Sequence, residues 1–324
     1  MSGGRGWKEV GDRLDWVDAA RGIGIVAVVV GHVWTRGALR DAVYSFHMPL
    51  FFLLSGYLFR ARPLLPFAGR LLLLQGVSYV AFLALVVGID ILVEGSRGRL
   101  GIFHVWPRDL WRLAYGGSQL RGPFTVFWFV PCLVFARIAF DACLVRLPGV
   151  RGGAWLALGF FSLGLAYGLG WWTDVSPLGL LTVPMAFFLL WVGLVWRGIA
   201  WRSWMLALLL PLSFAGLFMW PTLNMKAGDY GLPLLSIGGA IATSFLVFRL
   251  ARLWPFATPP VRYLGRASLV IMYLHVPVIH YLSWIGYRWE WGRPVLAAIA
   301  LLLPLAVYAL FLHTRFTRRL FLAE

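Results

Sequence analysis

Charged residues and cysteines are both scarce in this sequence. Only 13% of its 324 residues are charged, against about 25% in an average soluble domain. The two cysteines, Cys132 and Cys143, belong to one apolar segment. Eleven residues of helix would separate them by about 16 Å, which is too far for a disulfide. Cysteines and histidines nowhere show the spacing of a metal motif, so we predict no disulfide and no metal site.

Lysine is scarce as well, and this bears on the meaning of the positive charge. The net charge is +16, yet Lys8 and Lys226 are the only lysines and arginine supplies the rest. The arginines form short clusters between apolar runs, which is typical of the loops that flank membrane-spanning segments. We therefore predict no nucleic-acid partner for this basic chain.

Long apolar runs make up most of this sequence, whereas a soluble protein has more charged residues. Hydrophobic residues make up 60% of the chain, against about 45–50% in soluble domains, and the mean hydropathy is +0.79. The runs are continuous, whereas barrel strands would alternate over about ten residues. We predict an all-α integral membrane protein, embedded in a lipid bilayer, in which residues 1–324 form a single domain.

Ten segments are predicted as transmembrane helices, each near the roughly 20 residues that span a bilayer. They cover residues 17–35, 43–60, 70–93, 124–145, 154–171, 177–196, 203–220, 231–252, 266–285 and 294–313. Residues 94–123 are more polar, and we predict a long outer loop with an interfacial helix near 105–115. Arginine and lysine are more frequent in the inner flanks when the N-terminus is placed inside, so both termini are predicted to be cytoplasmic.

The first two apolar segments carry an unusual set of ionisable residues. Asp18, Arg21 and His32 belong to the first segment, and His47 belongs to the second. Ionisable residues inside a membrane are costly and usually mark function. Arg21 and His32 are eleven residues apart, so they share one helix face at depths that differ by about 16 Å. Asp18 can pair with Arg21, which follows it by one turn.

Two interpretations fit this arrangement. In the first, Arg21 holds a phosphate-bearing donor at the cytoplasmic mouth, and a histidine deeper in the membrane acts as general base on an acceptor hydroxyl. In the second, Asp18 and Arg21 form an interfacial ion pair, and His32 makes a hydrogen bond between helices. The spacing of the residues is compatible with both.

The same segments contain recognisable motifs. D-x-A-R-G-I-G-I-x-x-V-x-x-G-H (Asp18–His32) and S-F-H-M-P-L-F-F-L-L-S-G-Y (Ser45–Tyr57) resemble the start of the membrane-bound acyltransferase-3 family. Within that family they are similar to the small sugar O-acetyltransferases akin to fucose 4-O-acetylase. The segment L-G-R-A-S-L-V-I-M-Y-L-H (Leu264–His275) resembles a later family motif, and F-W-F-V-P-C-L-V-F (Phe127–Phe135) resembles a third.

The resemblance implies an integral membrane O-acyltransferase. Its donor would be an acyl-CoA, acetyl-CoA first of all, which is a co-substrate from the cytoplasm and not a permanently bound cofactor. Its acceptor would be a hydroxyl of a surface or lipid-linked glycan on the outer side of a bacterial inner membrane, with polysaccharide-assembly proteins as partners. The alternative is a multi-pass transporter or polysaccharide-export subunit with proton-relay histidines, which the lack of an inverted repeat disfavours.

The resemblance also assigns roles to residues of the first two segments. The family's helix-1 histidine and arginine fall on His32 and Arg21, and the histidine of its F-H-M-P segment falls on His47. We therefore expect His32 and His47 to be catalytic and Arg21 to bind the donor. Asp18, the partner of Arg21, joins the catalytic candidates.

Donor binding is also expected near the start of the third segment. Many relatives carry a basic pair there, of which this chain keeps only Arg70, since Phe67 occupies the other position. We expect Arg70 to bind the donor phosphates, with Arg60 and Arg62 supplying the missing charge.

Four further residues are candidates for contact with the acceptor. Asp90 and Glu94 share a face near the outer end of the third segment, where they can orient His32 or bind sugar hydroxyls, or lie at the interface as charged acids. His275 matches a family position, and its alternative is a buried, hydrogen-bonded histidine. Trp106 can stack on a sugar or belong to an aromatic belt at the membrane surface.

Overall fold

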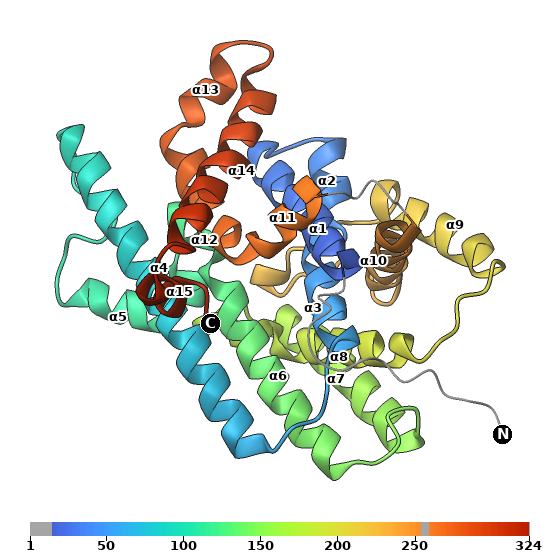
Figure 1. The fold of residues 1–324 in the computed structure, drawn as a ribbon. Coiled ribbons are helices and arrows are strands. Elements are labelled where there is room, and N and C mark those ends of the chain that lie inside the picture. The colour runs from blue at the N-terminus through green and yellow to red at the C-terminus, as the bar shows by residue number, and fades with distance from the viewer. Residues whose placement is uncertain (1–14, 254–258, 324) are drawn as a thin grey trace.

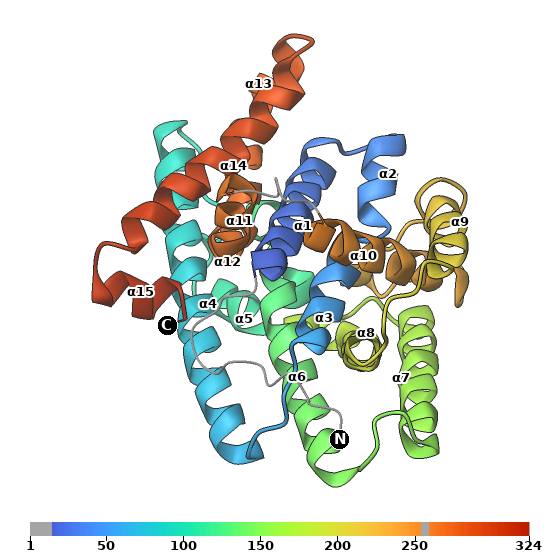
Figure 2. The same ribbon diagram turned by 45° about the vertical axis from the view of Figure 1, so that its right-hand side comes forward.

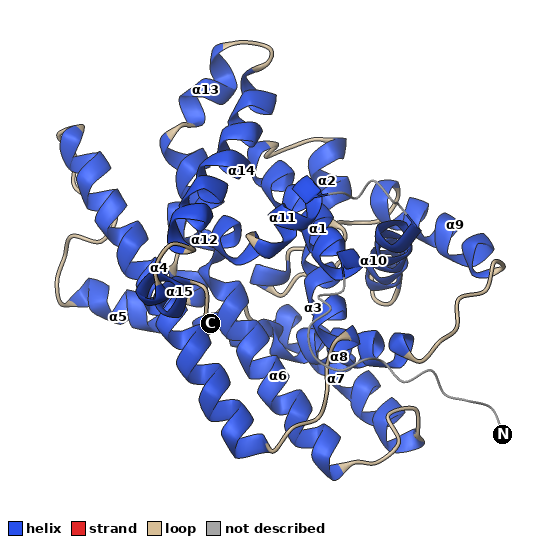
Figure 3. Ribbon diagram, viewed as in Figure 1, coloured by secondary structure: helices blue, strands red, loops and turns tan. Residues whose placement is uncertain are grey.

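The computed structural model describes residues 15–253 and 259–323, and within these ranges the chain folds into helices joined by loops (Figure 3). Seven stretches are long and apolar enough to cross a membrane. They are α1 (Asp15–Val33), α4 (Leu64–Ser96), η2 with α6 (Gly122–Trp128 and Phe129–Arg146), α7 (Gly153–Trp172), η3 with α8 (Pro177–Thr182 and Val183–Arg197), α10 (Leu235–Leu253) and α14 (Gly292–Phe311). The predicted all-α membrane fold is confirmed.

Shorter helices connect these stretches. Two of them, α9 (Met205–Phe218) and α12 (Ser268–Tyr281), are apolar. The others are α2 (Ala38–Tyr44), α3 (His47–Tyr57), α5 (Arg108–Tyr115), η1 (Gly117–Gln119), η4 (Met225–Ala227), α11 (Pro259–Arg266), α13 (Ser283–Arg288) and α15 (Arg315–Phe321). Each of the ten predicted segments thus contains a helix. The number of crossings and the side of the termini stay predictions, and the basic N-terminal residues lie outside the described ranges.

The second predicted segment, 43–60, is not one helix. α2 ends at Tyr44, and α3 begins at His47. Pro49 explains the break, because a continuous helix would need its missing N–H to donate to the carbonyl of Ser45. Within the first turn of a helix a proline is well tolerated, so the chain starts a new helix here. His47 therefore stands at the first position of α3.

Two other predicted segments differ from the observed helices. The ninth, 266–285, is divided among α11, α12 and α13. The third is longer than expected, since α4 has 33 residues and so rises about 50 Å, beyond the roughly 30 Å of a hydrocarbon core. In Figure 1 its last turns extend past the neighbouring helices, so the end of α4 reaches the loop that leads to α5.

α1 lies at the centre of the bundle, in contact with α2, α3, α10, α11, α12 and α14 (Figure 2). Glycines permit the closest of these contacts. A Cβ on Gly22 would lie 2.1 Å from the carbonyl oxygen of Val261, and one on Gly265 would lie 1.8 Å from that of Asp18. α1 and α11 therefore touch backbone to backbone, as small residues allow in membrane bundles. Asp18 of α1 is consequently buried between helices, whereas the side chain of Arg21 remains 41% exposed.

α3 is held equally closely by α8. A Cβ on Gly56 would lie 2.0 Å from the carbonyl oxygen of Leu190, and one on Gly193 would lie 2.1 Å from that of Leu53. Each helix thus offers a glycine to the backbone of the other. Because α3 also contacts α1 and α10, this short helix is fixed inside the bundle and positions His47 beside α1.

Candidate active site

α1 presents Arg21 and His32 at two levels of the bundle. Arg21 lies near the start of the helix and His32 in its last turn, which separates them by about 16 Å along the axis. Each of the two side chains belongs to the wall of a different cavity. As their spacing predicted, Arg21 and His32 therefore lie at different depths along one helix. The two cavities show which neighbouring residues each of them meets.

The first cavity, called the arginine cavity below, has a volume of 320 Å³. Apolar residues of α3, α6 and α12 form much of its wall. Five arginines also line it, namely Arg21, Arg60, Arg62, Arg137 and Arg266. None of the described side chains in this lining is a carboxylate. Guanidinium groups match phosphate oxygens in shape and charge, so this cavity suits a ligand with several phosphates.

Asp18 positions two of these arginines. Its carboxylate accepts a hydrogen bond from Nε of Arg266 at 3.0 Å and lies 4.0 Å from Nη1 of Arg21. The predicted pairing with Arg21 is present, although Arg266 is the nearer partner. Fourteen residues separate Asp18 from His32, or about 21 Å of helix. Asp18 therefore lies at the level of the arginines and away from the histidines, and its catalytic role stays a prediction.

Arg137 is the member of the arginine cavity that the motifs did not indicate. Its guanidinium lies 5.7 Å from the ring centre of Phe67, and its buried Nε has no hydrogen-bond partner among the described residues. An unpaired buried donor is costly, and an anionic ligand would supply the acceptor. The sequence feature that could have indicated Arg137 is its position as a single arginine within an apolar run. Arg70, by contrast, is exposed on α4 and outside this lining, and its role in donor binding stays a prediction.

The second cavity, called the histidine cavity below, has a volume of 160 Å³. The polar side chains in its wall include those of His32, Tyr44, His47, Thr125, Asn224 and Lys226. Phe129 and Met272 belong to the walls of both this cavity and the arginine cavity. Both residues lie within the motif segments near 127–135 and 264–275. The two cavities are thus neighbours, separated by one aromatic ring and one flexible thioether side chain.

Three histidines share one hydrogen-bond pattern. Nδ1 of His32 lies 2.9 Å, and Nδ1 of His47 and of His275 each lies 2.7 Å, from the carbonyl oxygen four residues earlier in the chain. Because a carbonyl only accepts, Nδ1 is assigned the proton, and Nε2 of each ring remains an acceptor. A neutral imidazole with an available Nε2 is the form that a general base requires.

His32 and His275 are in direct contact. Their ring centres are 4.9 Å apart, and Nε2 of His275 lies 3.5 Å from Nδ1 of His32. If Nε2 of His32 takes up a proton, the imidazolium keeps two acceptors at Nδ1, the Val28 carbonyl and His275. His275 is fully buried and belongs to none of the cavities described here. Its contact is thus with His32, whereas the sequence offered it for contact with the acceptor, which stays a prediction.

Lys226 faces the histidine cavity from η4. Its Nζ donates hydrogen bonds to the carbonyl of Leu120 at 2.7 Å and to Oγ1 of Thr125 at 2.8 Å. Burial, and to a smaller extent the neighbouring Arg121, lower the pKa of Lys226 to about 8. The ammonium form still predominates at pH 7, since this pH lies below the pKa. Nothing in the sequence placed this loop lysine beside the histidines.

A third cavity, called the side cavity below, has a volume of 250 Å³ and lies between α1, α12, α13 and α14. Its polar lining includes His32, Thr35, His280, Ser283, Tyr287 and Arg293. His32 belongs to the walls of both the side cavity and the histidine cavity. The three cavities thus form a series, with the arginines at one end and His32 between the last two.

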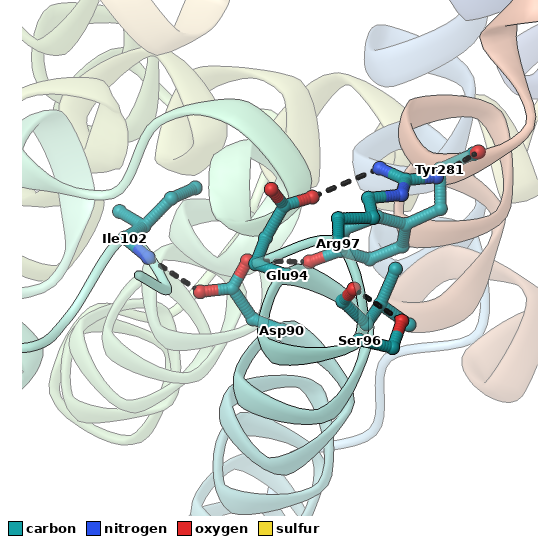
Figure 4. A network of polar contacts seen from close by, with 7 residues as sticks. Asp90, Glu94, Ser96, Arg97, Ile102 and Tyr281 are labelled. Carbon is teal, nitrogen blue, oxygen red and sulfur yellow. Dashed lines mark hydrogen bonds and ion pairs between the residues drawn. The ribbon is translucent and has the colours of Figure 1, made fainter. Parts of the chain in front are cut away.

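Asp90 and Glu94 belong to a separate network at the end of α4 (Figure 4). Asp90 accepts 2.6 Å hydrogen bonds from the hydroxyl of Tyr281 and from the backbone N–H of Ile102. Glu94 pairs with Arg97 at 2.9 Å, and Arg97 donates to the Tyr281 carbonyl at 3.0 Å. Neither acid lines the three cavities. They join α4 to α12 and to the following loop; among the described residues neither acid is hydrogen-bonded to His32, and their contact with the acceptor stays a prediction.

Trp106 lies just before α5, the helix predicted near residues 105–115, and its side chain is 48% exposed. Asp109 fixes the start of α5, because its carboxylate accepts hydrogen bonds from the backbone N–H groups of Val105 at 2.7 Å and His104 at 2.8 Å. The first of these bonds does most to lower the pKa of Asp109. Trp106 lines none of the three cavities, and its contact with a sugar stays a prediction.

Comparison with known families agrees with this architecture. Residues 14–313 match the family model of the acyltransferase domain that defines the acyltransferase-3 family. Since this match covers nearly the whole chain, the protein belongs to that family and is a membrane acyltransferase. No curated protein and no solved structure matches the chain. The narrower resemblance to sugar O-acetyltransferases stays a prediction.

Proposed function

We propose that this protein transfers an acyl group from acyl-CoA to a hydroxyl of a glycan. The observation that carries the proposal is the series of cavities, in which Phe129 and Met272 join the first to the second and His32 joins the second to the third. A donor with phosphates at one end and a thioester at the other fits the first two cavities. A hydroxyl that reaches His32 from the side cavity completes the reacting pair.

The donor binds with its phosphates in the arginine cavity. Its pantetheine arm passes between Phe129 and Met272 and places the thioester in the histidine cavity. The arm must cover the distance between the levels of Arg21 and His32, about 16 Å along α1, which an extended arm can bridge. The histidine cavity, at 160 Å³, is smaller than the roughly 300–1,000 Å³ of pockets for drug-sized ligands. A short acyl group fits it best, which favours acetyl-CoA.

The acceptor binds in the side cavity. Hydroxyl, imidazole and guanidinium groups line this space, and together they offer the donors and acceptors that sugar hydroxyls need. The aromatic ring of Tyr287 and the cation of Arg293, whose guanidinium lies 6.0 Å from that ring, add a surface on which a sugar can rest. A surface or lipid-linked glycan is therefore the proposed acceptor.

His32 is the proposed general base, with a typical contribution of about 10²–10⁴-fold. Its Nε2 takes the proton of the acceptor hydroxyl as the hydroxyl oxygen bonds to the thioester carbonyl carbon. The C–S bond then breaks, and the departing thiolate takes the proton from the imidazolium. His47, whose Nε2 is also an acceptor, can hold an amide N–H of the pantetheine arm. Both substrates meet at His32, so no covalent acyl-enzyme is required.

The proposed direction follows the charge of the flanks. With the N-terminus inside, the arginine cavity opens towards cytoplasmic acyl-CoA, and the side cavity lies towards the outer face. This direction suits a bacterial inner membrane in which glycans, delivered by polysaccharide-assembly partners, are acylated on the outer side.

Replacement of His32 by alanine in a host that expresses the protein tests the proposal. We expect His32→Ala to remove the acyl groups that the wild-type protein adds to surface glycans, while the glycans are still exported, because the general base is missing. Mass spectrometry of the isolated glycans measures this difference.

The matched control is His313→Ala. His313 is exposed beyond the end of α14 and lines none of the three cavities. This variant should leave acylation at the wild-type level. Glycans that remain fully acylated in the His32→Ala strain would sink the assignment of His32 as the base. Loss of export as well as acylation would favour a transport role instead.

A further inference from the structure

Lys226 is a positively charged side chain without a carboxylate partner among the described residues. It is half-buried. Its two hydrogen bonds go to neutral acceptors, the carbonyl of Leu120 and the hydroxyl of Thr125. An ammonium group has three donors, so one N–H remains for a further acceptor. Because Lys226 lines the histidine cavity, its ammonium group is a candidate donor to an acceptor bound there.

The other nitrogen groups in this wall have a different character. His32 and His47 use Nδ1–H for backbone carbonyls and present Nε2 as an acceptor. In this tautomer Nε2 carries no proton and cannot donate to an anionic oxygen in the cavity. Among the residues that line the histidine cavity, Lys226 is the one with a cationic side chain. The cavity therefore combines a base with a separate cationic donor, and a donor aimed at the developing oxyanion accelerates acyl transfer through a tetrahedral intermediate.

The location of Lys226 also distinguishes the two substrates. His32 lines both the histidine cavity and the side cavity, whereas Lys226 lines only the first of these. In the proposed function the thioester occupies the histidine cavity and the acceptor occupies the side cavity. Lys226 is thus placed to interact with the donor's carbonyl group and not with the acceptor.

We propose that Lys226 is a catalytic residue whose Nζ donates a hydrogen bond to the thioester carbonyl oxygen as negative charge develops on it. This inference rests on the proposed function. When the acceptor oxygen bonds to the carbonyl carbon, the carbonyl π electrons move to oxygen and the hydroxyl proton moves to Nε2 of His32. When the carbonyl re-forms, the C–S bond breaks and the thiolate accepts that proton. Lys226 keeps its own proton throughout.

A purely structural role is the competing explanation, because Lys226 also joins η4 to the segment around η2. A neutral donor would make the same two hydrogen bonds without the expense of burying a cation. A structural role therefore does not explain the positive charge of Lys226. An oxyanion that forms inside the cavity would explain it, because the ammonium group stabilises negative charge.

The test compares Lys226→Met, which removes the charge, with Lys226→Arg, which keeps it. Purified protein in lipid nanodiscs is supplied with acetyl-CoA and a panel of methyl glycosides, and release of the CoA thiol is followed. We expect the kcat of Lys226→Met to fall about 100-fold, as on loss of one oxyanion donor. The dissociation constant for CoA, measured by calorimetry, should stay within twofold of wild type. Lys226→Arg should recover a large part of kcat.

Arg121→Met is the matched control, since it removes the neighbouring cation outside the three cavities and should keep kcat within about twofold. A Lys226→Met variant with wild-type kcat, or one altered only in the KM for the glycoside, would overturn the proposal. A lower unfolding temperature in both Lys226 variants, with equal loss of kcat, would show a structural role. A wild-type protein that binds no CoA and releases no thiol would instead refute the proposed function itself.

Discussion

At the scale of single residues, hydrogen bonds to the backbone determine what the histidines can do. The Val28 carbonyl fixes the proton of His32 on Nδ1, which leaves Nε2 as the basic site. His275, at 3.5 Å from the same Nδ1, adds a second acceptor for the imidazolium. Both neighbours contact the same nitrogen of His32, and His275 lines neither of the cavities where the substrates are proposed to meet.

Arg137→Met should weaken donor binding more than it slows the reaction. The change removes one guanidinium from the arginine cavity and leaves an apolar side chain. A hydrogen bond to a charged group contributes about 1.5–3 kcal/mol, so the KM for acetyl-CoA should rise about 10- to 100-fold, with kcat within about threefold. Initial rates of thiol release as a function of acetyl-CoA concentration measure both constants.

Arg70→Met is the comparison for this variant, because Arg70 is exposed and outside the arginine cavity. Its KM should remain within about twofold of wild type. The reverse outcome, in which Arg70→Met raises KM and Arg137→Met does not, would restore the role predicted for Arg70 from the family pattern. It would also remove the arginine cavity from the donor path.

The site residues on one helix could be predicted from sequence, and those on other elements could not. Helical periodicity is enough to place Arg21 and His32 on one face at different depths. Arg137 and Lys226 join them only through the packing of α6 and η4, which no local pattern encodes. The acids at the end of α4 illustrate the same limit, since the sequence offers Asp90 for contact with the acceptor but does not show that it is bound to Tyr281 and Ile102.

At the scale of elements, proline and glycine account for much of the difference between predicted and observed helices. Apolar runs predicted that helices exist in ten segments, and each contains one. Hydropathy does not reveal that a run is interrupted, so the break before α3 was missed although Pro49 marks it. The glycine contacts between α1 and α11 and between α3 and α8 likewise depend on which helices become neighbours.

Asp90→Asn should destabilise the junction between α4 and α12 without a direct effect on catalysis. One carboxylate oxygen becomes an NH₂ group, so either the Ile102 N–H or the Tyr281 hydroxyl loses its acceptor. A buried group left without a partner costs about 1–3 kcal/mol. We expect a loss of this size in the free energy of unfolding, measured by denaturant titration in detergent, with kcat retained.

Glu94→Gln serves as the control, because its ion pair with Arg97 is partly exposed and such pairs contribute about 0–1 kcal/mol. This variant should resemble wild type in stability and activity. An Asp90→Asn protein that is as stable as wild type but has a raised KM for the acceptor would instead support the acceptor contact predicted from the sequence.

At the scale of the whole molecule, the proposed function depends on a path through the bundle. The three cavities are lined by helices from both ends of the chain, with α1 and α3 on one side and α12, α13 and α14 on another. Helices distant in sequence form such a path only when the bundle is assembled. The sequence therefore predicted Arg21, in the wall of the first cavity, and His32, between the last two, but neither the cavity volumes nor the positions of Phe129 and Met272.

The direction of this path leads to the last prediction, which concerns the orientation of the chain. Arg36 follows α1, and Arg146 ends α6; both are exposed and should lie on opposite sides of the membrane. In a chain whose two native cysteines are replaced by alanine, Arg36→Cys should react with an impermeant maleimide in intact spheroplasts. Arg146→Cys should react only after permeabilisation.

The opposite labelling pattern would place the arginine cavity on the outer side of the membrane. Acyl-CoA is a cytoplasmic metabolite, so its phosphates could not reach the arginines from that side. The cysteine-free parent, which should not be labelled, controls for background reaction. The orientation of the chain thus decides whether the arginine cavity can bind cytoplasmic acyl-CoA. The labelling experiment tests this without requiring that the acceptor sugar be known.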